Sequence, residues 1–238
     1  MRDVTQQPLL NIVGLQAWYG ESHILHGVDM HVRRGEVVCL LGRNGAGKST
    51  TLRSVMGIVA KRKGSIAFEG VETISLSSDK IARLGLAFCP EERAIFSSLD
   101  VKENLLLPPQ VKEGGLSLEQ IFALFPNLEE RLASQGTKLS GGEQQMLAIG
   151  RILRTGADLL LLDEPTEGLA PVIIQQIAAT IRALKERGFT ILLVEQNFRF
   201  ASTLADRYYV MEHGKIIDSF ANSELQANMQ KLHDYLGV

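Results

Sequence analysis

The sequence feature that most constrains the fold is a glycine-rich octapeptide that ends in lysine and serine. It follows an apolar run typical of a buried strand, Glu36 to Leu41, and precedes a segment with helical character, Lys48 to Val59. The octapeptide fits the pattern G-x-x-x-x-G-K-[ST], in which glycines let backbone N–H groups face phosphate oxygens. Its residues are Gly42, Arg43, Asn44, Gly45, Ala46, Gly47, Lys48 and Ser49. The order strand, glycine-rich loop, helix predicts a phosphate-binding loop in an α/β protein.

The residues of this loop predict a site for ATP with Mg²⁺. The side chain of Lys48 would reach the β- and γ-phosphates, and the Ser49 hydroxyl would ligate Mg²⁺. The next residue, Thr50, would add a hydrogen bond to a phosphate. The residues expected to surround the phosphates with backbone N–H groups are Gly42, Asn44, Gly45, Ala46 and Gly47.

A second apolar run ends in two carboxylates, as Leu159-Leu160-Leu161-Leu162-Asp163-Glu164. Ligands in open α/β sheets lie at the carboxyl ends of the strands, so these acids are expected beside the phosphate-binding loop. Asp163 would hold Mg²⁺, and Glu164 would act as the general base that polarises the attacking water. Such a run is a weak signal alone and gains its meaning from the phosphate-binding loop.

Composition and charge exclude several other classes of protein. The 238 residues include 45% hydrophobic and 22% charged residues, which is typical of a folded globular protein. A formal net charge of −2 gives no electrostatic reason to expect nucleic acid as a partner, and we read Lys61-Arg62-Lys63 as a solvated turn.

Residues 1–10 contain no apolar targeting segment, and no run is long enough to span a membrane, so a cytoplasmic location is expected. Cys39 and Cys89 lack the spacing of a disulfide or metal site and are expected in the core.

The order of predicted elements divides one domain, residues 1–238, into three parts. Alternating runs at about 8–35 and 64–75 predict an antiparallel β lobe. Helical signals predict an inserted helical lobe at about 98–153, and the remainder forms the core. Strands and helices alternate again after residue 157, which predicts a mostly parallel sheet covered by helices on both faces.

A third motif, Leu139-Ser140-Gly141-Gly142-Glu143-Gln144-Gln145, opens a predicted helix just before the second acidic motif. In residue type and position it resembles the signature of ABC ATPases, and the resemblance covers essentially the whole chain. It implies a RecA-like P-loop core and a head-to-tail dimer in which Ser140, Gly141 and Gly142 act on the ATP of the other subunit. It also places Tyr19 where the family has its adenine-stacking aromatic residue. Trp18, beside it, is the alternative. Because neighbouring strand residues face opposite ways, one of the two is expected to stack on adenine and the other to pack inward.

Three positions depart from the commonest family pattern. Glu91 stands where most members have the glutamine that senses magnesium, so we expect it to contact metal or nucleotide. Gln196 stands at the position of the switch histidine; an amide can hydrogen-bond a γ-phosphate but cannot shuttle protons. Ala170 replaces an aspartate that makes a contact across the dimer.

Together these departures resemble the second, shorter ATPase of branched-chain amino acid uptake transporters, a branch that includes urea and short-amide relatives. The resemblance implies two membrane-spanning permease subunits, an external substrate-binding protein, and a second, non-identical ATPase. A homodimer is the alternative assembly. The chain would then lie on the inner face of the membrane through the permease subunits.

Other functions stay open at this stage. A lipopolysaccharide-type exporter would use a similar ATPase, and a non-transport ABC ATPase belongs to a different class. Gln196 also leaves open a subunit that is gated by nucleotide while its partner carries out hydrolysis.

Overall fold

A six-stranded sheet, largely parallel, forms the centre of the computed structural model, which describes residues 7–237; residues 1–6 of the predicted polar N-terminus lie outside this range. The strand order is β10-β9-β3-β8-β7-β6, and only the β9–β10 pair is antiparallel. All residues of β3, β7 and β8 are buried, so their sequences are continuous apolar runs rather than alternating ones. The strands are β3 Val37–Leu41, β6 Leu86–Cys89, β7 Leu159–Asp163, β8 Thr190–Glu195, β9 Arg207–Glu212 and β10 Lys215–Ala221.

A second, antiparallel sheet has the order β2-β1-β4-β5 and includes the predicted strands of the β lobe. Its strands are β1 Leu10–Tyr19, β2 Ser22–Val32, β4 Lys61–Phe68 and β5 Val71–Glu72. The prediction of a turn at Lys61-Arg62-Lys63 is wrong. These residues begin β4, where all three pair with β1 residues while Lys61 and Lys63 stay exposed to solvent. Strand pairing thus extends through a charged run. Lys61 and Lys63 lie on the outer face, and the guanidinium of Arg62 donates to the carbonyl oxygens of Val59 and Leu76.

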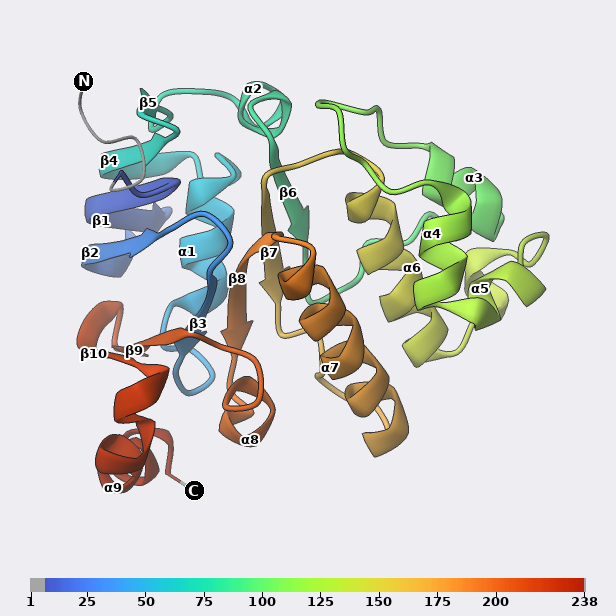
Figure 1. The fold of residues 1–238 in the computed structure, drawn as a ribbon. Coiled ribbons are helices and arrows are strands. Elements are labelled where there is room, and N and C mark those ends of the chain that lie inside the picture. The colour runs from blue at the N-terminus through green and yellow to red at the C-terminus, as the bar shows by residue number, and fades with distance from the viewer. Residues whose placement is uncertain (1–6, 238) are drawn as a thin grey trace.

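Both faces of the six-stranded sheet are covered (Figure 1). Val37, Cys39 and Leu41 of β3 belong to a core cluster shared with α6 and α7. The alternate residues Val38 and Leu40 pack instead with α1 and the antiparallel sheet. The two cysteines are buried and free, as predicted. The helices of the core are α1 Lys48–Val55, α2 Ser78–Arg83, α7 Pro171–Glu186, α8 Phe198–Ala201 and α9 Leu225–Leu236, with a 3₁₀ turn, η3, at Asn222–Glu224.

Two helices differ from the sequence-based expectation. The helix after the phosphate-binding loop ends at Val55 rather than Val59, because Gly57 adopts a left-handed conformation with φ of 72°. Helix α9 was not predicted. Its buried residues Leu232 and Leu236 belong to the same core cluster as α6 and α7.

The predicted helical lobe contains four helices that lie on the side of the central sheet away from the antiparallel sheet (Figure 1). They are α3 Val101–Leu106, α4 Leu118–Leu124, α5 Pro126–Glu130 and α6 Gly141–Leu153, with a 3₁₀ turn, η2, at Gly136–Lys138. Asp100, Ser117 and Ser140 begin α3, α4 and α6 with capping boxes, which satisfy the first free N–H groups of each helix. Within residues 7–237, no helix combines the length and apolar character needed to cross a bilayer.

Arg207 of β9 joins the two sheets through a charged network. Its guanidinium donates to both oxygens of Glu36 at 2.8 Å and to the backbone carbonyl of His31 in β2 at 2.8 Å. Both side chains of the Arg207–Glu36 pair are largely buried, at 14% and 12% exposure. A buried carboxylate that loses its guanidinium partner keeps its desolvation cost, so this pair matters more than an exposed one.

We therefore predict that Arg207→Ala lowers the free energy of unfolding by about 2 kcal/mol, measured by urea denaturation. The matched control is Arg187→Ala, which removes an exposed arginine and is expected to change stability by less than about 0.5 kcal/mol. Equal effects of the two substitutions would contradict the assigned role of the Arg207–Glu36 pair.

Candidate nucleotide site

The carboxyl ends of three neighbouring parallel strands, β3, β8 and β7, meet at one edge of the central sheet. Strand β3 continues into the phosphate-binding loop, and β8 lies between β3 and β7. The register aligns Leu41 of β3 with Glu195 of β8, and Val194 of β8 with Asp163 of β7. The acidic residues at the end of β7 therefore lie one strand away from the loop, as the sequence predicted.

Two glycines of the loop occupy positions that other residues would not tolerate. A Cβ on Gly42 would lie 2.6 Å from the carbonyl oxygen of Met211. Gly47 has φ of 110°, and a Cβ there would lie 2.9 Å from the side chain of Leu25. The loop therefore packs directly against β9 and β2, and this close approach fixes the start of α1.

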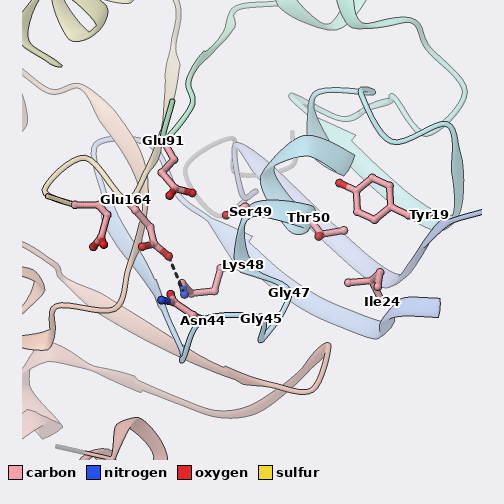
Figure 2. A pocket seen from close by; sticks show the side chains of 11 residues that line it. Tyr19, Ile24, Asn44, Gly45, Gly47, Lys48, Ser49, Thr50, Glu91 and Glu164 are labelled. Carbon is pink, nitrogen blue, oxygen red and sulfur yellow. Dashed lines mark ion pairs between the residues drawn. The ribbon is translucent and has the colours of Figure 1, made fainter. Parts of the chain in front are cut away.

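The side chain of Lys48 is buried, and its ammonium group has three polar partners. Its Nζ lies 2.9 Å from Oε1 of Glu164, with the two side chains only 2% and 9% exposed. The same Nζ donates to the carbonyl oxygens of Gly42 at 2.9 Å and Arg43 at 3.1 Å. Figure 2 shows Lys48 and Glu164 pointing toward each other across the site. The predicted phosphate-binding lysine and the predicted general base are therefore in direct contact.

Asp163 and Ser49 form the second polar contact of the site. The Ser49 hydroxyl donates to Oδ1 of Asp163 at 2.9 Å. The other carboxylate oxygen, Oδ2, is buried and has no hydrogen-bond partner among the described residues. Burial, with a smaller contribution from the Glu164 carboxylate, raises the pKa of Asp163 to about 6, although the hydrogen bond from Ser49 opposes this rise. An unpartnered carboxylate oxygen beside a hydroxyl is the oxygen-rich arrangement that Mg²⁺ prefers, so these residues fit that ion.

A cavity of about 420 Å³ opens above this edge of the sheet. Tyr19, at its rim, is 47% exposed, and Glu91 approaches from the loop after β6 (Figure 2). The lining residues are Tyr19, Ile24, Asn44, Gly45, Gly47, Lys48, Ser49, Thr50, Glu91, Glu164 and Glu167. Most of the residues predicted to bind nucleotide therefore surround one cavity.

The expectation that one of Tyr19 and Trp18 packs inward is wrong, because neither side chain enters the core. Trp18 shows this most clearly. Its side chain is half-buried and stacks on His23 with 4.3 Å between ring centroids, while the ammonium groups of Lys61 and Lys63 lie over the ring. The adjacent residue Ala17 is the one that enters the core. Trp18 thus faces the outer side of the antiparallel sheet, where cations complement its ring.

Several predicted site residues do not line the cavity. Gly42 contributes its carbonyl oxygen to Lys48, and Ala46 lies behind the loop in a smaller pocket. Gln196 is exposed just after β8. Ser140, Gly141 and Gly142 begin α6 in the helical segment, where a Cβ on Gly142 would lie 2.9 Å from Ile173 of α7. None of the three lines the cavity of its own chain.

Three residues near the site were not predicted. Ile24 and Glu167 line the cavity, and Glu195 is 2% exposed at the end of β8. Glu195 carries the same signal that drew attention to Asp163: an apolar run that ends in an acid. No pattern of spacing pointed to Ile24, because its place depends on how β2 packs beside the loop.

Comparison with known proteins identifies the family. The family description "ABC transporter" matches residues 25–167, which is more than half of the chain. The chain belongs to the ABC transporter family. It is the subunit that binds and hydrolyses ATP in such a transporter.

Individual relatives are similar over nearly their whole length. The chain is 44% identical to the high-affinity branched-chain amino acid transport ATP-binding protein BraG of Pseudomonas aeruginosa, covering 96% of this chain and 100% of that protein. It is 35% identical to the probable branched-chain amino acid transport ATP-binding protein LivF of Archaeoglobus fulgidus, covering 91% and 94%. It is 32% identical to the lipopolysaccharide export system ATP-binding protein LptB of Escherichia coli, covering 92% and 93%.

Solved structures confirm the predicted fold class. A nucleotide-free ATP-binding cassette from an ABC transporter superposes with a TM-score of 0.82 at 24% identity, covering 98% of this chain and 99% of that one. An ATP-binding subunit of an ABC transporter gives a TM-score of 0.80 at 27% identity, covering 97% and 100%. The parallel core, the antiparallel sheet and the added helices are therefore those of an ABC ATPase.

The raised pKa of Asp163 predicts a pH-dependent change in stability. Because this pKa is about 6 in the folded protein and 3.8 in a model peptide, ionisation of Asp163 costs stability as the pH rises from about 4 to about 6. We predict that Asp163→Asn becomes more stable relative to the wild type over that range, measured by urea denaturation with EDTA present. Glu167→Gln, which changes an exposed acid, is the control. A stability difference for Asp163→Asn that stays constant with pH would contradict the burial effect.

Proposed function

We propose that this chain is the ATPase subunit of an importer for branched-chain amino acids or a closely related substrate. The observation that supports the substrate class most strongly is the 44% identity to BraG over the whole of that protein. The site supports the chemistry, since one cavity gathers the phosphate-binding loop and the acidic end of β7. Urea and short-amide substrates remain alternatives within the same branch.

In the proposed mechanism the chain's own side chains hold ATP and move one proton. Tyr19 stacks on the adenine, while Lys48 and the N–H groups of residues 44–50 bind the phosphates. Glu164 accepts a proton from the attacking water as general base. In this arrangement the γ-phosphate takes over the ion pair of Lys48, which leaves the Glu164 carboxylate available to the water.

The proposed metal site consists of Ser49 Oγ and Asp163, with Glu91 at its edge. When bound there, Mg²⁺ would neutralise negative charge on the β- and γ-phosphate oxygens. The unpartnered Oδ2 of Asp163 supports this assignment. Glu91 differs from the usual glutamine, and its carboxylate retains an oxygen ligand for metal or water.

Two contacts with other proteins belong to the proposal. Ser140, Gly141 and Gly142 would close over the γ-phosphate bound to a second ATPase subunit. The capping box uses the N–H groups of Ser140 and Glu143, whereas those of Gly141 and Gly142, at the first two helical positions, have no intrahelical acceptor. We favour a non-identical second ATPase over a homodimer, together with two permease subunits and an external binding protein. The chain, as a single domain of residues 1–238, would then lie against the inner face of the membrane through those permeases.

Gln196 is proposed to hydrogen-bond the γ-phosphate after the subunits close. It is exposed in the single chain, so this role requires movement of the loop after β8 or the approach of the second subunit. Because an amide does not exchange protons near neutral pH, Glu164 carries the proton transfer in this proposal.

The substitution Glu164→Gln is expected to preserve ATP binding and to lower kcat by at least about 100-fold, because the amide cannot accept the proton. ATP affinity is measured by equilibrium binding, and turnover by phosphate release from the assembled complex. Glu167→Gln, at the exposed rim of the same cavity, is the control and should keep most activity. Wild-type turnover by Glu164→Gln would contradict the assignment of the base.

The transport role is tested by purifying the tagged chain from its native cells in mild detergent and identifying its partners by mass spectrometry. Two permeases and a second, longer ATPase are expected, with ATP hydrolysis stimulated by a binding protein loaded with a branched-chain amino acid. Recovery of lipopolysaccharide export components, suggested by the 32% identity to LptB, would replace the importer by an exporter. Recovery of nucleic-acid-associated proteins without permeases would overturn the transport proposal.

A further inference from the structure

Glu195 is a buried acid beside the site, and the reaction described above does not use it. It is the last residue of β8, and its Cα pairs with that of Leu41, the residue before the phosphate-binding loop. The preceding residue, Val194, pairs with Asp163. Glu195 therefore lies between the strand that leads into the phosphate-binding loop and the strand that carries the predicted metal ligand and base.

The two carboxylate oxygens of Glu195 connect two different loops. Oε1 accepts a hydrogen bond from the Thr166 hydroxyl at 2.8 Å, and Thr166 lies in the loop that follows Glu164. Oε2 accepts from the backbone N–H of Asn197 at 3.2 Å, in the loop that carries Gln196. Both Thr166 and Glu195 are buried, so water does not compete freely for these contacts. One carboxylate thus fixes the loop of the proposed base and the loop of the proposed γ-phosphate contact relative to each other.

The loop after β7 needs such a contact because its first residue is strained. Glu164 has φ of 44°, a left-handed conformation that non-glycine residues rarely adopt. This conformation persists only where surrounding contacts hold it. The Glu164 N–H donates to the Val194 carbonyl at 3.0 Å, and the Glu167 N–H donates to the Glu164 carbonyl at 3.1 Å. The Thr166–Glu195 hydrogen bond adds a side-chain contact to the same turn, again from β8.

We infer that Glu195 is a positioning residue, which holds Glu164 and the Gln196 loop in the geometry for ATP hydrolysis through its hydrogen bonds to Thr166 and Asn197. This inference rests on the proposed role of Glu164 as general base. Glu195 itself need not touch ATP or water. Its effect is on turnover rather than on nucleotide binding, because neither hydrogen bond involves the phosphate-binding loop.

The pH dependence of kcat gives a second test, because Glu195 can gain or lose a proton. Burial, with a smaller contribution from the nearby Glu164 carboxylate, raises the pKa of Glu195 to about 7, although the hydrogen bonds from Thr166 and Asn197 oppose this rise. From β3, the buried Cys39 thiol is close enough to feel the charge of Glu195: burial, and then Glu195, raise the pKa of Cys39 well above its usual value, while Lys48 opposes this rise. The ionised carboxylate accepts both hydrogen bonds, so kcat is expected to fall as the pH decreases through about 7.

The experiment compares Thr166→Val, Thr166→Ser and Glu195→Gln with the wild type, all purified as the assembled complex through a tag on this chain. Thr166→Val removes the hydroxyl at nearly constant volume, whereas Thr166→Ser keeps it and is the matched control. We expect Thr166→Val and Glu195→Gln each to lower kcat roughly ten-fold, with KM for ATP within about two-fold of the wild type. Thr166→Ser should stay within about two-fold in both. The double variant should lose little more than Glu195→Gln alone, because both substitutions act on the contact between residues 166 and 195.

The pH profile separates positioning from a merely structural role. The limb of kcat near pH 7 should move to higher pH in Thr166→Val, which lacks a hydrogen bond to the carboxylate, and should disappear in Glu195→Gln. Thermal unfolding confirms that each variant is folded at the assay temperature. Wild-type kcat and an unchanged pH limb in folded Thr166→Val would overturn the inference.

Glu164→Gln, assayed in parallel, distinguishes a failure of the positioning role of Glu195 from a failure of Glu164 as the general base. If Glu164→Gln is inactive while Thr166→Val and Glu195→Gln turn over normally, Glu164 remains the base and the inference about Glu195 fails. If Glu164→Gln turns over at the wild-type rate, the proposed base fails instead, and with it the reason for positioning that residue.

Discussion

The parallel register of β3, β8 and β7 is the constraint on which the rest of the structure depends. Because these strands run in the same direction, their carboxyl ends deliver the phosphate-binding loop, Glu195 and Asp163 to one edge of the sheet. The apolar residues that fix this register also make the strands fully buried. The packing of the core and the assembly of the site therefore have the same cause.

Charge balance at this edge explains why the site suits a nucleotide with a divalent cation. Asp163, Glu164 and Glu195 are all buried, while Lys48 pairs directly with Glu164. Burial raises the pKa values of Asp163 and Glu195, and their hydrogen bonds offset only part of this effect. Further negative charge at this edge is therefore unfavourable. Positive charge beside Asp163 would relieve this, and the free oxygen of Asp163 indicates where a cation would be held.

The sequence predicted the fold class and the centre of the site because both are coded by local patterns. The octapeptide from Gly42 to Ser49, the acids at the end of β7 and the helix start at Ser140 depend on short spacings, and the structure contains each element. Trp18 was misplaced because alternation states only that neighbours face opposite sides, and Ala17 is the residue that enters the core. The role of Glu195 was missed because it depends on β8 lying between β3 and β7, and strand order is not written in any local pattern. Helix α9 was missed because no strong motif marks it.

The most direct test of the central claim is a structure of the assembled complex with Mg²⁺ and a non-hydrolysable ATP analogue. The account predicts Ser49 Oγ and Asp163 at the metal, Lys48 Nζ on the terminal phosphates, and the adenine against Tyr19. It also predicts that Glu164, no longer paired with Lys48, faces the water beside the γ-phosphate. A nucleotide bound away from the phosphate-binding loop, or a metal without contact to either Ser49 or Asp163, would contradict it.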